Sequence, residues 1–445
     1  MLKGFFEPDS VAVIGASRTP GKVGHAVLKS LKAGFKGRIY PVNPNAAEIL
    51  GLRCYPSVLE VEDRVDLAVI CVPAASVPDV LDECEKKGVR FSVIISSGFS
   101  EVGRRDLEEK LKGRRLRIIG PNCVGVFDPY TGVDTLFMPE ERMRRPGRGH
   151  ISFVTQSGAV GTAVLDVLSD IGVGISKFAS IGNRVDVTEV ELLRFLESDP
   201  NTRCIAMYLE SVSDGKKFVR EVRRCKKPVV CLKAGKSESG TRAAASHTGS
   251  LAGSYRLYSS VFRQFGVLEA KTLEELVDFS KVLASQPPMN GRRLAIVTDG
   301  GGFGILAADA AENLGFELPD FDSRTGKKLR EVLPDYASVS NPLDLTGDSD
   351  SERYRNVLSL VFSDPNVDGV VVIALLQIAT LDERIVDVLA ECKVYGKPFV
   401  VCASGGEYTR RQVRRLERLG IPVFPSPERA VAAINALRLF SEARK

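Results

Sequence analysis

One histidine in this chain has surroundings that suit a phosphoryl carrier. The 445 residues include three histidines, and His247 lies among small residues in the segment 246–253. Unperturbed imidazole titrates at about pH 6.5, so near neutral pH much of it is an uncharged nucleophile that can accept a phosphoryl group and pass it on. The neighbouring glycines and alanines leave the backbone little restrained. A loop histidine without a task is the alternative.

A carboxylate could orient this imidazole. Glu210 comes soon after the apolar run 204–207, at the predicted carboxyl end of a strand. Sites in α/β folds assemble at such strand ends. A hydrogen bond from one ring nitrogen to Glu210 would leave the other nitrogen free to attack. A solvated glutamate at a strand end is the alternative.

Two glycine turns are candidates for phosphate binding. Gln156, Ser157 and Gly158 form one turn, and Gly301 and Gly302 belong to the other; each turn joins a predicted strand to a predicted helix. Unpaired amides and the positive end of the helix dipole favour an anion at such turns. If the two turns face each other, both helices could hold one phosphate. Two ordinary glycine turns are the alternative.

A further turn near the N-terminus could bind a phosphorylated ligand. Gly15 and Ser17 follow the apolar run 11–14. The glycine spacing differs from the dinucleotide fingerprint, and Asn43 stands where nicotinamide enzymes need an acidic residue for the ribose hydroxyl. A dehydrogenase is therefore disfavoured, whereas a nucleotide-like ligand or a turn needed only for packing both stay open.

These residues need a scaffold, and the first 135 or so residues predict a parallel sheet. Short β-rich runs alternate there with helical segments, a pattern typical of a sheet covered by helices on both faces. A stretch rich in proline, glycine and arginine at 139–149 then marks a boundary. The predicted strands are 11–14, 38–42, 67–72, 91–95 and 116–119.

The rest of the chain contains one unit twice. Three matches recur in the same order in both halves, and only the first half carries the histidine segment. Such repetition predicts two domains of one fold, here flavodoxin-like and doubly wound. The matched segments are 151–161 with 294–304, 198–201 with 363–366, and 227–231 with 397–401.

The sequence thus predicts an α/β protein with a Rossmann-like domain followed by two flavodoxin-like doubly wound domains. The predicted boundaries are 1–138 for the first domain, 150–270 for the second and 290–445 for the third, with a helical linker at 271–289.

Composition narrows the classes of function. The net charge of +5 is spread along the chain without a basic aromatic stripe, which disfavours nucleic-acid binding. Nine cysteines without C-x-x-C spacing indicate a reducing compartment and neither a disulfide framework nor a metal site. The longest apolar stretch, 370–376, is far short of the roughly 20 residues that span a bilayer, and the first residues lack a signal-peptide core. We expect a cytoplasmic protein that binds neither nucleic acid nor membrane.

Taken in order, these motifs resemble the α-subunit of ADP-forming acyl-CoA synthetases, the acetyl-CoA synthetase type related to succinyl-CoA synthetase. The resemblance covers nearly the whole chain. Its strongest marks are Ser-His-Thr-Gly at 246–249 and Gly-Pro-Asn-Cys-Val-Gly at 120–125. Further marks are Val-Ile-Gly-Ala-Ser at 13–17, Val-Pro at 72–73 and Ser-Gly-Phe at 97–99.

The resemblance implies a role for each of these residues. It implies that the first domain binds CoA, that His247 is phosphorylated and that Glu210 orients it. It also implies that the turns at 156–158 and 301–302 begin paired phosphate-binding helices. The positions that line up with CoA contacts are Gly15, Ser17, Lys22, Asn43, Val72, Pro73, Ser97 and Asn122.

The resemblance also implies a heteromeric ligase. The reaction would be acyl-CoA + phosphate + ADP ⇌ carboxylate + CoA + ATP, through an acyl phosphate and a phosphohistidine, for a small carboxylic acid. We recognise no ATP-grasp region, so a β-subunit with that fold would bind ADP or ATP with Mg²⁺, in an α2β2 assembly. The third domain is a departure, because in succinyl-CoA synthetase a similar domain belongs to the β-subunit. A CoA-binding regulatory protein descended from the enzyme is the alternative, disfavoured by the intact histidine motif.

Overall fold

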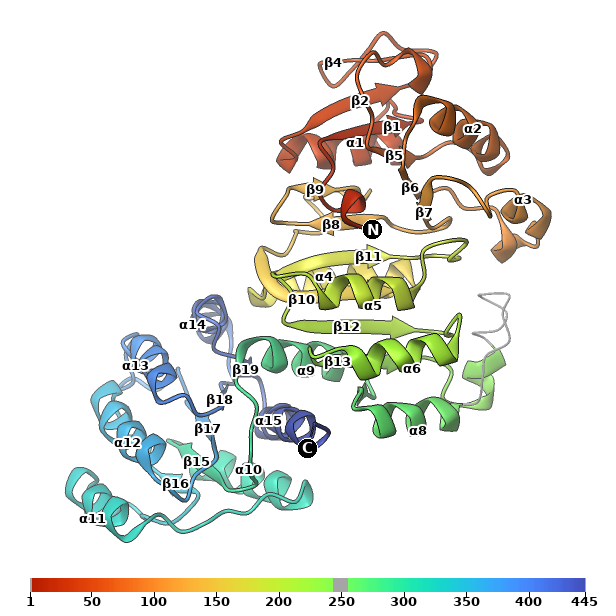
Figure 1. Ribbon diagram of the computed structural model, residues 1–445. Helices are drawn as coiled ribbons and strands as arrows, with labels where there is room; N and C mark the ends of the chain where they lie inside the picture. Colours follow the sequence, from red (N-terminus) through yellow and green to blue (C-terminus); the bar gives the residue numbers. More distant parts are fainter. Residues whose placement is uncertain (1, 243–254, 445) are drawn as a thin grey trace. The chain divides into compact units, whose positions relative to one another are not determined.

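Three mainly parallel sheets organise the part of the chain that the computed structural model describes, residues 2–242 and 255–444 (Figure 1). The chain divides into two compact units. The first comprises the residues up to Asp170 with Gly174–Leu273, and the second Ile171–Val173 with the residues from Glu274 onward. Each unit is described by itself below.

The first sheet contains five parallel strands that are apolar along most of their length. Its strands are β1 (Ser10–Ile14), β2 (Arg38–Val42), β5 (Leu67–Ile70), β6 (Phe91–Ile94) and β7 (Arg117–Ile119), in the order β2-β1-β5-β6-β7. Its helices are α1 (Val23–Gly34), α2 (Val77–Lys87) and α3 (Arg105–Glu109), with the short hairpin β3 (Glu48–Ile49) and β4 (Leu52–Arg53) beside β2. β1 and β5 are buried along their whole length, as strands covered on both faces must be. The predicted strand positions are confirmed to within two residues.

The second sheet continues the first unit. Its parallel strands are β10 (Arg148–Thr155), β11 (Ile175–Ser180), β12 (Cys204–Leu209), β13 (Val229–Lys233) and β14 (Leu268–Ala270). Its helices are α4 (Gly158–Ile171), α5 (Glu189–Glu197), α6 (Gly215–Arg224) and α8 (Tyr255–Phe265). The strand order is β14-β13-β12-β10-β11, and α5, α6 and α8 follow one another along this sheet (Figure 1).

Two short strands that the sequence did not predict extend this sheet beyond β11. They are the antiparallel β8 (Val126–Asp128) and β9 (Val133–Asp134). Strands of three and two residues are too short to leave a periodic pattern. Asp128 holds β8 in place through an ion pair of 3.0 Å with the buried Lys177 on β11. Residues assigned to the first domain from sequence thus contribute strands to the second sheet, and the predicted domain boundaries stay a prediction.

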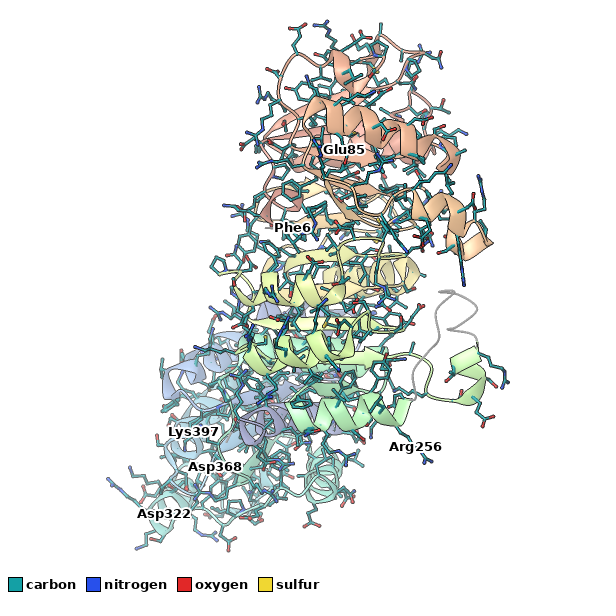
Figure 2. All side chains as sticks on the ribbon, turned by 45° about the vertical axis from the view of Figure 1, so that its right-hand side comes forward. Phe6, Glu85, Arg256, Asp322, Asp368 and Lys397 are labelled. Atoms are coloured by element: carbon teal, nitrogen blue, oxygen red, sulfur yellow. The ribbon has the colours of Figure 1, made fainter. Side chains whose placement is uncertain are left out.

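Contacts at three places tie the two sheets of this unit together. Arg117 at the start of β7 donates to both carboxylate oxygens of Asp186, at 2.8 and 3.1 Å, and to Glu191 at 2.7 Å. Phe6, labelled in Figure 2, stacks on Phe195 with ring centroids 5.4 Å apart. Further along, the amide of Asn122 donates to Asn183 at 3.3 Å. The first sheet is therefore held against the second at both ends of its strands, with Phe6 and Arg117 at the amino ends and Asn122 beyond the carboxyl end of β7.

The second unit contains the third sheet, again of five parallel strands. These are β15 (Leu294–Thr298), β16 (Leu343–Asp344), β17 (Gly369–Ile373), β18 (Phe399–Cys402) and β19 (Val423–Phe424), in the order β16-β15-β17-β18-β19. Its helices are α9 (Leu273–Ser285), α10 (Gly301–Asn313), α11 (Ser323–Val332), α12 (Ser351–Ser363), α13 (Ile385–Glu391), α14 (Glu407–Arg418) and α15 (Pro427–Glu442). α9, predicted as a linker, is fixed within this unit by the ion pair of Asp278 with Arg429 at 2.7 Å.

The second and third sheets confirm the predicted repeat. Numbered along the chain, the five parallel strands of both sheets have the flavodoxin-like order 2-1-3-4-5. Equivalent side chains also make equivalent contacts: Lys227 donates to the carbonyl of Asp199 at 2.6 Å, and Lys397 (Figure 2) donates to that of Asp364 at 2.6 Å. The matched sequence segments therefore mark one structure built twice.

Two general features of the described residues bear on function. None of their helices combines the length and apolar character needed to cross a bilayer. All nine cysteines carry free thiols, and eight of them are buried.

The close contact between the first turn of α1 and the Gly15 turn gives a stability test. A Cβ added at Gly24 would lie 2.0 Å from the Gly15 carbonyl oxygen, whereas one at Gly147 meets nothing within 4 Å. Gly24→Ala should lower the free energy of unfolding by about 1–3 kcal/mol, because backbone must shift. Gly147→Ala should change it by less than about 0.5 kcal/mol. Urea unfolding measures both, and equal effects would contradict this packing.

Candidate functional site

The structure brings the predicted CoA-binding residues to one edge of the first sheet. Because its five strands are parallel, their carboxyl ends meet there, and the order reverses between β1 and β5, where open α/β sheets bind ligands. Gly15 and Ser17 follow β1, Asn43 follows β2, Val72 and Pro73 follow β5, Ser97 and Asn122 follow β6 and β7, and Lys22 immediately precedes α1. Contact of these residues with CoA stays a prediction.

The turn after β1 brings the backbone unusually close to its neighbours. Gly15 has φ +86°, and a Cβ there would lie 2.9 Å from the carbonyl carbon of Cys71. Only glycine fits such a position without strain. Asn43 supports the turn from β2: its amide donates to the Ala16 carbonyl at 2.7 Å and accepts from the amide of Asn45 at 2.8 Å. Asn43 therefore braces this turn, whatever else it contacts.

The remaining predicted CoA contacts differ in exposure. Lys22, Pro73 and Ser97 are exposed, so the Lys22 ammonium can meet a phosphate from solvent. Asn122 has φ +56° and is partly buried between the two sheets. Its partner Asn183 donates at 2.7 Å to both Glu101 and Glu108. A polar network thus joins the carboxyl edge of the first sheet to the loop after β11.

The carboxyl edge of the second sheet holds Gln156 and Glu210 side by side. Gln156 follows β10 and Glu210 follows β12, two neighbouring strands. The Gln156 Oε1 accepts from the backbone amides of Glu210 at 2.7 Å and Ser211 at 3.0 Å, and its Nε2 donates to the Ser211 carbonyl at 2.7 Å. Gln156 is 7% exposed and its side-chain amide is hydrogen-bonded within the protein, while its predicted contact with phosphate stays a prediction.

Arg184 and Glu189 hold the same strand end, and sequence reasoning missed both. The Arg184 guanidinium donates to the Ser211 carbonyl at 3.1 Å, to its hydroxyl at 2.7 Å and to Glu189 at 3.1 Å. Glu189, fully buried, accepts from the amide of Ser213 at 2.7 Å. Nothing in the sequence around these residues indicates the contact, because both lie in a loop and a helix start distant from residue 210.

Lys233 is a third residue that the sequence reasoning did not select. It ends β13, pairs in register with Leu209, and is fully buried with its ammonium 4.7 Å from the ring centre of Tyr258. Burial lowers the pKa of Lys233, while Glu210 and Cys231 oppose that shift. A lysine at the end of an otherwise apolar strand was the available signal. It places a cation near Glu210, at the point where the chain leads on to the histidine segment.

His247 belongs to residues 243–254, which lie outside the described part of the chain. Its contact with Glu210 and its phosphorylation stay predictions. Glu210 itself is 6% exposed, and its presence raises the pKa of the adjacent Tyr208, where burial is the larger cause, to about 12.

The two glycine turns have the same local structure in their separate units. The hydroxyl of Thr155 donates to the Ser157 carbonyl at 2.8 Å, and that of Thr298 to the Gly300 carbonyl at 3.0 Å. α4 and α10 follow these turns and have 14 and 13 residues, long enough for a developed dipole. Phosphate binding by Ser157 and Gly158 in one unit, and by Gly301 and Gly302 in the other, stays a prediction.

Acidic groups flank the start of α10. A Cβ at Gly301 would lie 2.8 Å from Asp344 Oδ2, so this carboxylate approaches the first turn closely. Asp299, 2% exposed, accepts from the amide of Leu375 at 3.1 Å. Burial raises the pKa of Asp299 to about 6, and Asp344 adds to that rise.

Three family models match consecutive parts of the chain. They are a CoA binding domain over residues 9–129, a succinyl-CoA ligase like flavodoxin domain over 148–283, and a ligase-CoA domain over 294–444. Together they extend over nearly all of the described structure.

Individual relatives match along the full length. The α-subunit of ADP-forming acetate–CoA ligase I from Pyrococcus furiosus is 41% identical over 99% of this chain and 98% of its own length. The chain belongs to the family of ADP-forming acetate–CoA ligase α-subunits. The ADP-forming acetate–CoA ligase I of Archaeoglobus fulgidus is 42% identical over 99% of this chain, which spans 64% of that longer protein.

A solved structure agrees with this membership. An acetyl-coenzyme A synthetase of Ca. Korarchaeum cryptofilum, solved with phosphate and ADP, is 38% identical, with a TM-score of 0.92 over 100% of this chain and 97% of that one. The family resemblance found in the motifs is confirmed, as is the fold class of a CoA-binding domain followed by flavodoxin-like domains.

In this α-subunit family member, Asp299 makes stability depend on pH. Its carboxyl keeps a proton in the folded chain up to about pH 6 but loses it near 3.8 when unfolded. Stability therefore falls as pH rises from about 4 to 6, by about 2–3 kcal/mol. Asp299→Asn keeps the acceptor for Leu375 and should remove this fall. The readout is the protection of β15 and β17 against hydrogen exchange in urea, compared at pH 4.5 and 7.5. If the protection of Asp299→Asn differed from that of the parent by the same amount at both pH values, the raised pKa of Asp299 would be contradicted.

Proposed function

We propose that this chain is the α-subunit of a cytoplasmic, heteromeric acyl-CoA synthetase that interconverts acyl-CoA, phosphate and ADP with a small carboxylic acid, CoA and ATP. Its partner would be an ATP-grasp β-subunit that binds ADP with Mg²⁺, in an α2β2 assembly. The observation that carries the proposal is Glu210, held by Gln156 at the carboxyl edge of the second sheet, beside the strand that leads to His247. Family membership supports the same reaction.

The first step forms an acyl phosphate. A phosphate oxygen attacks the thioester carbon, the carbon–sulfur bond breaks, and CoA leaves as a thiolate that takes up a proton. Donors at the start of α4, near Ser157 and Gly158, would stabilise the phosphate charge. The exposed Lys22 and the Gly15 turn would hold the phosphate end of CoA at the edge of the first sheet.

The second step moves the phosphoryl group to His247. The free ring nitrogen attacks phosphorus, the bond to the acyl oxygen breaks, and the carboxylate leaves. Glu210 accepts a hydrogen bond from the other ring nitrogen, which fixes the tautomer and stabilises the positive charge that develops on the ring.

The third step returns the phosphoryl group to a nucleotide on the partner subunit. The nitrogen–phosphorus bond breaks as an oxygen of the ADP β-phosphate bonds to phosphorus, giving ATP and free imidazole. A covalent carrier joins two reaction centres while keeping the phosphoryl group from water. Movement of the carrier segment is then part of the catalytic cycle.

The proposal predicts a phosphoprotein that depends on His247. Chain incubated with acyl-CoA and labelled phosphate should take up acid-labile, base-stable label, and His247→Ala should take up none, because the accepting nitrogen is gone. The affinity of His247→Ala for CoA, measured by calorimetry, should stay within about twofold, since the CoA edge is unchanged. Glu210→Gln should slow labelling by a factor of about 100. Label that persists in His247→Ala would refute the assignment.

A screen with the partner subunit identifies the acid. The two chains, purified together, are tested with carboxylic acids for thioester formation that needs both ATP and CoA.

A further inference from the structure

In both copies of the flavodoxin-like fold, a side chain just after the first strand accepts a hydrogen bond from a backbone amide just after the third strand, but the residue types differ. Thr155 pairs with Tyr208 in the first copy, and Thr298 pairs with Ile373 in the second. The residues that follow the two threonines, Gln156 and Asp299, are therefore equivalent. Glu210 and Leu375, each two residues beyond the partner of its threonine, are equivalent as well. Both equivalent contacts exist: Gln156 accepts from the Glu210 amide at 2.7 Å, and Asp299 from the Leu375 amide at 3.1 Å.

In each copy, one of the two hydrogen-bonded residues carries a carboxylate. It belongs to the residue that donates its backbone amide in the first copy and to the residue that accepts in the second. In the first copy the holding residue, Gln156, is neutral and the held residue, Glu210, is acidic. In the second copy the holding residue, Asp299, is acidic and the held residue, Leu375, is apolar. Leu375 lies over the turn before α10, since a Cβ at Gly300 would be 2.7 Å from its Cδ1. The first copy thus has its carboxylate on the held residue, and the second copy has it on the holding residue.

The side-chain amide of Gln156 both accepts and donates hydrogen bonds, which an ionised carboxylate at this position could not do. Its oxygen accepts two backbone N–H groups while its nitrogen donates to the Ser211 carbonyl at 2.7 Å. These partners also fix which end is oxygen. A carboxylate would lose the donor and face that carbonyl with a negative oxygen. Asp299 illustrates the cost, because burial at the equivalent position raises its pKa to about 6.

Charged groups of both signs surround the strand end. Arg184 and Glu189 form an ion pair of 3.1 Å there, and Arg184 is further engaged with Ser211. Glu210 also raises the pKa of both the Tyr208 phenol and the buried Lys233 ammonium, although burial is the larger influence on each.

We propose that Gln156 is the positioning residue of the phosphoryl-transfer site: its neutral amide fixes the backbone of Glu210 without adding negative charge beside the acidic side chain. This rests on the proposed function, which gives Glu210 its task. It assigns Gln156 a different role from direct phosphate contact.

Two variants test the role in the complete complex with the partner subunit. Gln156→Glu keeps the acceptor but adds a charge, and Gln156→Met removes the hydrogen bonds at similar volume. Both should lower kcat about 10- to 100-fold at pH 7, with the KM for acyl-CoA unchanged within about twofold. In Gln156→Glu alone, the acid limb of the pH profile should move to higher pH, because two adjacent carboxylates resist joint ionisation.

Arg194→Met is the matched control. It removes a two-point contact with Glu221, at 3.0 and 2.6 Å, in the same domain but away from the strand end. It should leave kcat and the pH profile unchanged. Parental kcat and an unshifted profile in Gln156→Glu would overturn the role of Gln156. Parental protein that takes no label at His247 would instead refute the proposed function, so the two failures are distinguishable.

Discussion

All five central strands of each sheet run in one direction, and this constraint determines where function can lie. Parallel strands place their carboxyl ends at one edge, so loops distant in sequence meet there. Gly15, Asn43 and Asn122 meet by this rule in the first sheet, and Gln156 and Glu210 in the second. β1 and β13, each of five residues, are buried along their whole length, as strands covered on both faces are. Sheet topology therefore determines where the candidate site lies, and the individual side chains determine its chemistry.

Duplication of one fold gave two such edges, and the copies have diverged in charge. The scaffold contacts are the same: Lys227 and Lys397, each just before the next strand, donate to the aspartate carbonyl of the Ser-Asp-Pro-Asn turn of their own copy. What differs is the strand end: Glu210 in one copy and Leu375 in the other. The carboxylate belongs to the held residue in the first copy and to the holding residue, Asp299, in the second. The copy that carries the histidine segment is the copy with the acid at the strand end.

The sequence predicted the parts of this structure that repeat or alternate. The strand at 38–42 has the predicted bounds, and the duplicated motifs predicted two sheets of one topology. The hairpin of β8 and β9 escaped prediction because strands so short have no period, and the buried pair of Lys177 with Asp128 that attaches it joins residues far apart in sequence. The hydrogen bonds of Gln156 to the Glu210 backbone and of Arg184 to Ser211 were not predicted either, because both depend on which loops the sheet brings together. Glu210 could be selected from its residue type and its place after a strand, whereas its hydrogen bond with Gln156 is known only from the structure.

In the proposed reaction, His247 carries the phosphoryl group from one reaction centre to another. The most direct measurement is peptide mapping by mass spectrometry of chain that has reacted with acyl-CoA and phosphate, before and after addition of the partner subunit with ADP and Mg²⁺. We expect one phosphorylated site, at His247, and its phosphoryl group should disappear on addition of the partner as an equal amount of ATP forms. Phosphorylation at another residue, or a phosphorylated His247 that persists in the presence of partner and ADP, would contradict it.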